Sequence, residues 1–137
     1  MTLLLLVLLA TAPAHAAFTP SVHLAFDRPP RALSEHCAQA KARAEERLKE
    51  LARLPRASRT FANTPQALDD ILWDLSDETA SDTFSKYVSV SSDARNAAND
   101  CEALLGQFSV EVFSREDLYG AVKDFADTKP TLAGDAA

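Results

Sequence analysis

Six acidic residues occur in one short stretch, and their carboxylates are candidates for a catalytic or metal-binding site. They are Asp69, Asp70, Asp74, Asp77, Glu78 and Asp82. Carboxylates brought together can transfer protons or bind Ca²⁺. A calcium-binding EF-hand loop needs oxygen ligands at alternate positions and a glycine at its turn, and no glycine occurs in this stretch. We therefore interpret these residues as the solvated face of a helix.

The histidines do not form a zinc site. The chain contains His15, His23 and His36, and none belongs to the H-E-x-x-H motif that places two ligands and a general base on one helix face. His36 and Cys37 are adjacent, and neighbouring residues on a helix point about 100° apart. We expect a surface histidine and a half-buried cysteine there. No catalytic, cofactor-binding or metal-binding residue is assigned to any position of this chain.

Cys37 and Cys101 are the two cysteines of the chain. In an oxidising compartment they could form a disulfide, which would stabilise the fold by about 4 kcal/mol in the chain-entropy model. Both also lie on apolar helix stripes, where free buried cysteine is common. We expect two free thiols, with the disulfide as the alternative.

The remaining candidates have structural interpretations. Ser114 has no recognisable His or Asp arrangement to activate it and fits a helix cap. Phe108, Phe113, Tyr119 and Phe125 are expected in the core, because no basic residues interleave with them as nucleic-acid stacking would need. The net charge is −6, and neither G-x-x-x-x-G-K-[ST] nor G-x-G-x-x-G occurs. We therefore expect no nucleic-acid or nucleotide partner.

The N-terminal residues resemble a secretory signal peptide. Residues 1–16 contain an apolar run, Leu3–Ala10, followed by the small-x-small sequence Ala14-His15-Ala16. The run is too short to span a bilayer as a helix. We expect cleavage before residue 17, a periplasmic or secreted protein, and no stable membrane insertion afterwards. The alternative is a buried apolar strand or helix.

The rest of the chain predicts an all-α fold of about four antiparallel helices. An extended, proline-containing arm is expected at 17–33, with a candidate strand at 23–26. The expected helices cover 34–53, 65–87, 92–112 and 115–127, on apolar residues spaced by three and four. Their start signals are Ser34, Thr64 before Pro65, and a capping box from Ser114 to Asp117. The basic stretch at 53–59 is expected to be a solvated loop.

Three stretches occur in a familiar order. They are RTFANTPQALDDIL at 59–72, KYVSVSSDARNAANDCEALL at 86–105 and FSVEVFSREDLYGAVKDF at 108–125. Together they resemble the N-terminal helical region of the thimet oligopeptidase-like zinc metallopeptidases, the family of neurolysin, oligopeptidase A and dipeptidyl carboxypeptidase. The most specific cues are Thr60-Phe-x-Asn-Thr64, Val88-Ser89 before Asp93-x-Arg95, and Arg115-Glu-Asp-Leu-Tyr119. The resemblance runs from about Leu33 to the C-terminus.

This resemblance implies a role beside a catalytic region that lies elsewhere. In that family, helical halves enclose a channel for short peptides, and zinc is held by an H-E-x-x-H helix that this chain lacks. The resemblance implies a helical N-terminal domain at 34–128, inactive alone, whose partner is the missing catalytic region. Short peptide substrates would be reached only through that region. The residues at 129–137 are expected to be a frayed tail at a truncation point.

The alternative is a self-contained helical interaction module of the cell envelope, without catalysis. Such a module would fold compactly by itself and could pair with a second copy along residues 94–112.

Overall fold

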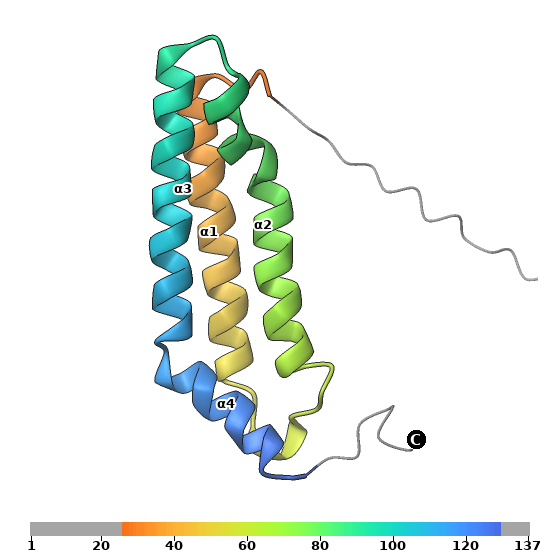
Figure 1. Ribbon diagram of the computed structural model, residues 1–137. Coiled ribbons are helices and arrows are strands. Elements are labelled where there is room, and N and C mark those ends of the chain that lie inside the picture. The colour runs from red at the N-terminus through yellow and green to blue at the C-terminus, as the bar shows by residue number, and fades with distance from the viewer. Residues whose placement is uncertain (1–25, 130–137) are drawn as a thin grey trace, which may run out of the picture.

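The fold is a bundle of three long helices with a fourth, short helix across one end. The computed structural model describes residues 26–129 (Figure 1). Its elements are α1 (Pro30–Ala52), the 3₁₀ turn η1 (Arg56–Ser58), α2 (Pro65–Val88), α3 (Ser92–Phe113) and α4 (Glu116–Ala126). Figure 1 shows α1, α2 and α3 side by side and α4 lying obliquely across their lower end. No strand occurs within 26–129, so the predicted all-α class is confirmed.

Several predictions fall outside the described residues. These are the signal peptide at 1–16, most of the arm at 17–33, the candidate strand up to residue 25, and the tail from residue 130. Within 26–129, no helix combines the length and the apolar character that crossing a membrane requires.

The first helix begins earlier than the sequence suggested. It starts at Pro30 rather than after Ser34. Proline suits the first helical position, because its missing N–H would have no partner there. Ser34 instead lies one turn into the helix, and its hydroxyl donates to the Pro30 carbonyl over 3.2 Å. The end of the expected arm is therefore helical.

Two other predicted caps are replaced by different contacts. The second helix does begin at Pro65, but the Thr64 hydroxyl makes no cap bond and bonds to the Asn63 side chain instead. The capping box at Ser114 is wrong. Ser114 is the last residue associated with α3, where its hydroxyl donates to the Val110 carbonyl, and Arg115 precedes α4.

The larger part of the core lies in the half of the bundle nearest α4. Leu48 is fully buried, and Phe108 is 2% exposed. Leu118 and Ala121 of α4 belong to the same cluster, so α4 closes the end of the bundle. Each fully buried large side chain contributes about 1.5–3 kcal/mol, which explains why the short α4 stays attached.

The other half of the core is built from small side chains and a disulfide. Ala97 and Ala98 pack there with Leu33, and Cys37 is bonded to Cys101 across a Cα–Cα distance of 5.9 Å. The prediction of two free thiols is therefore wrong. Small residues let α1 and α3 approach closely enough for the two sulfurs to meet. Apolar spacing placed both cysteines on helix stripes, but Cys37, expected to be half-buried, is 1% exposed, and the spacing did not reveal that the two cysteines face each other.

The aromatic residues divide into two groups. Phe108 and Phe125 are buried, as expected. Phe113 and Tyr119 are 76% and 68% exposed, so their assignment to the core is wrong. Val112 and Leu118, the residues directly before Phe113 and Tyr119, belong to the core cluster. Because a helix turns by about 100° per residue, the next side chain points away from the core.

Candidate functional site

A buried carboxylate joins three segments near the disulfide. Asp82 of α2 is fully buried. Its Oδ1 accepts a hydrogen bond from Arg28 Nε at 2.9 Å, and its Oδ2 lies 2.5 Å from His36 Nδ1. Arg28 precedes α1, whereas His36 lies within it. The prediction that Asp82 belongs to a solvated face is wrong, because its charge is compensated inside the protein.

The ion pairing continues along the seam between α1 and α2. Asp74 and Glu78 precede Asp82 at intervals of four, so the three carboxylates lie along one side of the helix. Arg47 contacts Asp74 at 2.7 Å, and Arg43 pairs with Glu78. These outer pairs are solvent-exposed, so each contributes little stability.

The charged groups of this seam already face partners within the bundle. Both nitrogens of His36 face carboxylates, because Nε2 lies 3.4 Å from Glu78 Oε1. Both oxygens of Asp82 are engaged as well. In residues 26–129, no group of three or more His, Cys, Asp or Glu side chains is arranged to hold a metal ion. The cluster acts as a structural tie between the start of α1 and the second half of α2.

The other sequence candidates are dispersed. Asp69, Asp70 and Asp77 are exposed, in keeping with the interpretation of a solvated face. Ser114 lies between α3 and α4, where its hydroxyl is bonded to backbone, while His36 lies in the first turns of α1. His15 and His23 lie outside the described residues. The structure does not bring these residues together.

The sequence contained a signal, not used above, for the pairing of Asp82 with residues of α1. Carboxylates at 74, 78 and 82 match basic or imidazole side chains at 47, 43 and 36, in the reverse order that antiparallel helices require. A comparison of the two helices for complementary charges would have predicted these ion pairs. Interpreting the acidic stretch of one helix alone did not predict them.

The basic stretch at 53–59 also contains a structural contact. The guanidinium of Arg59 is only 10% exposed and lies 2.6 Å from Asp124 of α4. Its Nε donates to the Leu54 carbonyl over 3.1 Å. The expectation of a wholly solvated loop is therefore wrong at Arg59, which fastens the link between α1 and α2 to α4.

At the start of α4, Arg115 and Asp117 form a two-bond contact. Arg115 Nε and one terminal nitrogen donate to the two carboxylate oxygens at 2.9 and 2.7 Å. The hydrogen bond from Arg115 lowers the pKa of the Asp117 carboxyl below its ordinary value, as its positive charge also does. An acidic first turn also suits the positive end of a helix.

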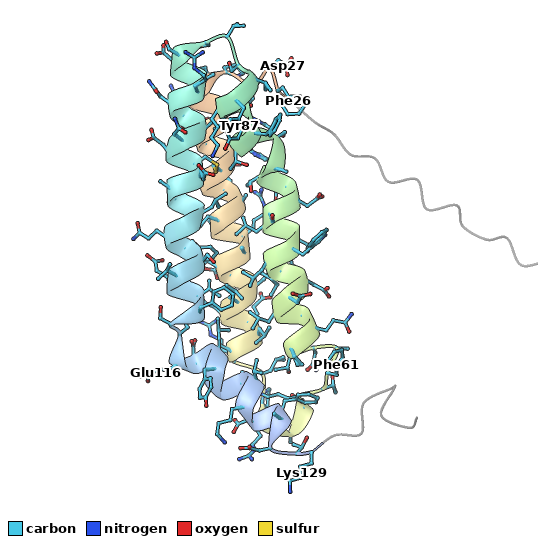
Figure 2. The ribbon with its side chains drawn as sticks, in the orientation of Figure 1. Phe26, Asp27, Phe61, Tyr87, Glu116 and Lys129 are labelled. Carbon is cyan, nitrogen blue, oxygen red and sulfur yellow. A yellow bond between two sulfur atoms is a disulfide. The ribbon has the colours of Figure 1, made fainter. Side chains whose placement is uncertain are left out.

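An open groove of about 540 Å³ lies between α2 and α3. Leu72 and Leu75 line it from α2, and Leu105 lines it from α3. Tyr87 lies toward the end where Phe26 is found (Figure 2). An ion pair between Lys86 and Glu102 belongs to the same lining. The groove is therefore mainly apolar and carries no unbalanced charge in its walls.

Comparison with known proteins gives a partial match. No family model matches the chain, and no solved structure matches it. A thimet-like oligopeptidase from Dictyostelium discoideum is 39% identical over 77 residues. The match covers 56% of this chain and 11% of that protein.

The chain thus spans about a tenth of the relative that it matches. The identity supports a family-level relationship to the thimet-like oligopeptidases and agrees with the resemblance carried by the sequence motifs.

Proposed function

We propose that this chain is the N-terminal helical part of an exported, zinc-dependent oligopeptidase that cuts short peptides, that it helps to wall the substrate channel, and that it is inactive alone. The observation that carries the proposal is the 39% identity to a thimet-like oligopeptidase. The all-helical bundle supports it, because the resemblance implies a helical wall.

Zinc and its chemistry would come from the catalytic region. This chain has no H-E-x-x-H motif, and the seam around Asp82 offers no open set of ligands. The contribution of the bundle would be steric. A rigid wall would admit short peptides and keep folded proteins away from the catalytic region, where zinc would polarise the peptide bond.

Export is supported by the disulfide. A bond between Cys37 and Cys101 persists in oxidising compartments and is rare where cytosolic thiol systems operate. Together with the signal-like sequence at 1–16, it favours a periplasmic or secreted location.

A chimera tests the proposal. The matching stretch of the Dictyostelium protein is replaced with the corresponding residues of this chain, and cleavage of a quenched fluorescent peptide is measured with and without a zinc chelator. We expect chelator-sensitive activity in the chimera, much reduced activity in a variant that lacks the stretch, and none from this chain alone. A folded chimera no more active than the deletion variant, or cleavage by this chain alone, would contradict the proposal.

A self-contained envelope module remains the second candidate, and one observation favours it. The described chain has its own buried core and an internal disulfide, features that suit an independent unit. This candidate predicts one sharp cooperative unfolding transition and no binding of a hydrophobic dye. The oligopeptidase proposal predicts dye binding by the apolar surfaces that the catalytic region would cover.

A further inference from the structure

The buried core of the bundle is divided into two clusters. Within residues 26–129, the cluster nearest α4 contains ten buried residues, and the cluster around the disulfide contains five, two of which are the bonded cysteines. The partly buried Leu105 packs against both clusters. The disulfide lies in the half of the bundle remote from α4 (Figure 2). Because the two clusters are otherwise separate, one end of the bundle can open while the other stays folded.

The disulfide is closed to reductants in the folded bundle. Cys37 and Cys101 are 1% and 3% exposed. Leu33 lies four residues before Cys37, hence on the same face of α1, and it is also 1% exposed. A thiolate must contact one of the sulfurs in order to break the S–S bond. Reduction of this disulfide therefore requires part of the bundle to open first.

The start of α1 is held against the bundle mainly by polar contacts. Arg28 Nε donates to Asp82 Oδ1 at 2.9 Å, and His36 Nδ1 lies 2.5 Å from Asp82 Oδ2. These two contacts bracket Leu33, which has the one large aliphatic side chain among the buried residues of the disulfide cluster. His36 is also the neighbour of Cys37 in the sequence. Loss of a partner of Asp82 would loosen this segment and leave the apolar contacts nearest α4 in place.

We propose that the contacts of Arg28 and His36 to Asp82 control the reduction of the Cys37–Cys101 disulfide, so that the start of α1 opens locally, a dithiol reductant reaches the sulfurs, and the cluster nearest α4 stays folded. This inference goes beyond the proposed function and does not rest on it, because it uses only contacts within the bundle. It makes the start of α1 a redox-sensitive segment of the chain.

The chemistry of the step is thiol–disulfide exchange. One thiolate of the dithiol attacks a sulfur of the disulfide, the S–S bond breaks, and the departing cysteine sulfur takes up a proton. The second thiol of the reductant then attacks the mixed disulfide and releases the other cysteine. Two electrons pass to the protein, and the reductant leaves as a disulfide.

Reduction would then leave the start of α1 weakly held. The remaining apolar contacts of that cluster come from Leu33, Ala97 and Ala98. Alanine side chains bury little area, and the stabilisation gained by burial is proportional to the apolar area. Without the covalent bond, this end of α1 should open more often, whereas the larger cluster keeps the rest of the bundle together.

The rate of reduction by dithiothreitol tests the control by Asp82 and its partners. Samples are quenched with an alkylating agent, and mass spectrometry counts the modified cysteines, after circular dichroism has verified helix content. Arg28→Ala should accelerate the reduction at least about fivefold, because it leaves a buried acceptor without its guanidinium. The matched control Arg31→Ala, whose side chain is 91% exposed, should stay within about twofold of the wild type. Equal rates for Arg28→Ala and the wild type would overturn the proposal.

Two further variants test where the bundle opens. Val112→Ala removes buried methyl groups from the cluster nearest α4, and Ser91→Ala removes the side chain that caps α3. Both should lower global stability and leave the reduction rate within about twofold of the wild type. Acceleration by Val112→Ala to the extent of its loss of global stability would show that reduction follows complete unfolding. Acceleration by Ser91→Ala would place the opening in α3, and either result would overturn the proposal.

The urea dependence of the reduction rate gives the same information without a substitution. Local opening exposes little surface, so the rate should rise only weakly with urea concentration. A rise as steep as that of the global unfolding equilibrium would overturn the proposal.

Hydrogen exchange of the reduced protein tests which end opens. We expect exchange at residues 34–41 of α1 to rise at least about tenfold on reduction. Exchange in α4 should change by less than about twofold, because this helix detaches by breaking contacts that the disulfide does not touch. Equal increases at both ends, or no increase at the start of α1, would contradict the proposal.

Discussion

Arg28 Nε donates to Asp82 Oδ1 over 2.9 Å, so a residue that precedes α1 is tied to a fully buried carboxylate of α2. The contact spans 54 positions of the sequence. It explains how the start of α1 is held against the bundle, where the neighbouring core consists mostly of small side chains.

Removing this guanidinium should destabilise the fold. Arg28→Ala leaves Asp82 with His36 as its remaining ion-pair partner, and an unsatisfied buried acceptor costs about 1–3 kcal/mol. Denaturant unfolding followed by circular dichroism measures the loss. The matched control is Arg31→Ala, whose side chain is 91% exposed and should change stability by less than about 0.5 kcal/mol. Equal effects of the two variants would show that the buried contact contributes nothing.

The disulfide should account for both thiols of the chain and for a large part of its stability. Thiol titration of denatured, unreduced protein is expected to give a value near zero. Reduction should lower the free energy of unfolding by about 4 kcal/mol, given the sequence separation of 64 between the cysteines. The double variant Cys37→Ala/Cys101→Ala should unfold like the reduced protein and be insensitive to reductant. Two free thiols in the native preparation would contradict the structure.

Arg59 should control how firmly α4 is attached. Its guanidinium bridges the Leu54 carbonyl and Asp124, so Arg59→Ala is expected to increase hydrogen exchange in α4 at least severalfold, with little change in α3. Arg56→Ala is the control, because Arg56 is 64% exposed and approaches the same carboxylate only to 3.7 Å. Exchange in α4 that rises equally in both variants would assign the effect to charge alone.

The Arg115–Asp117 contact predicts that the stability of the fold decreases at acidic pH. Because the folded-state pKa of Asp117 is lowered, its contribution to stability is present above the unfolded-state pKa and is lost as the pH falls through the folded-state value. The contribution is small, since the carboxylate is 52% exposed. An NMR titration should find the pKa of Asp117 below its ordinary value in the wild type and raised toward it in Arg115→Gln. Arg53→Gln should leave that pKa unchanged, and equal titrations in all three proteins would refute the contact.

The sequence predicted the helices well because their signals are local. Apolar spacing and Pro65 identified α2 without reference to any neighbour, and the predicted starts of α2 and α3 agree with the structure. The start of α1 was misjudged because Pro30 was read as part of an arm, although proline at the first position of a helix is favourable.

Features that depend on two helices were harder to predict. The pairing of Cys37 with Cys101 requires α1 and α3 to be adjacent and in register, which neither stripe specifies alone. The burial of Asp82 likewise depends on partners far away in the sequence. The groove between α2 and α3 is lined partly by exposed residues that a single-helix pattern treats as solvent-facing.

The disulfide has a mechanical consequence. Phe26 and Lys129 lie toward opposite ends of the bundle (Figure 2). Tension applied between them would pass along the start of α1, cross from Cys37 to Cys101, and continue through the rest of α3 and α4. The intervening loop, which contains the whole of α2 and its acidic seam, would carry no load. Stretching the oxidised protein would therefore release a contour shorter by about 200 Å than stretching the reduced protein, at roughly 3.3–3.6 Å per extended residue. The half of the groove built on α2 would be shielded from the applied force.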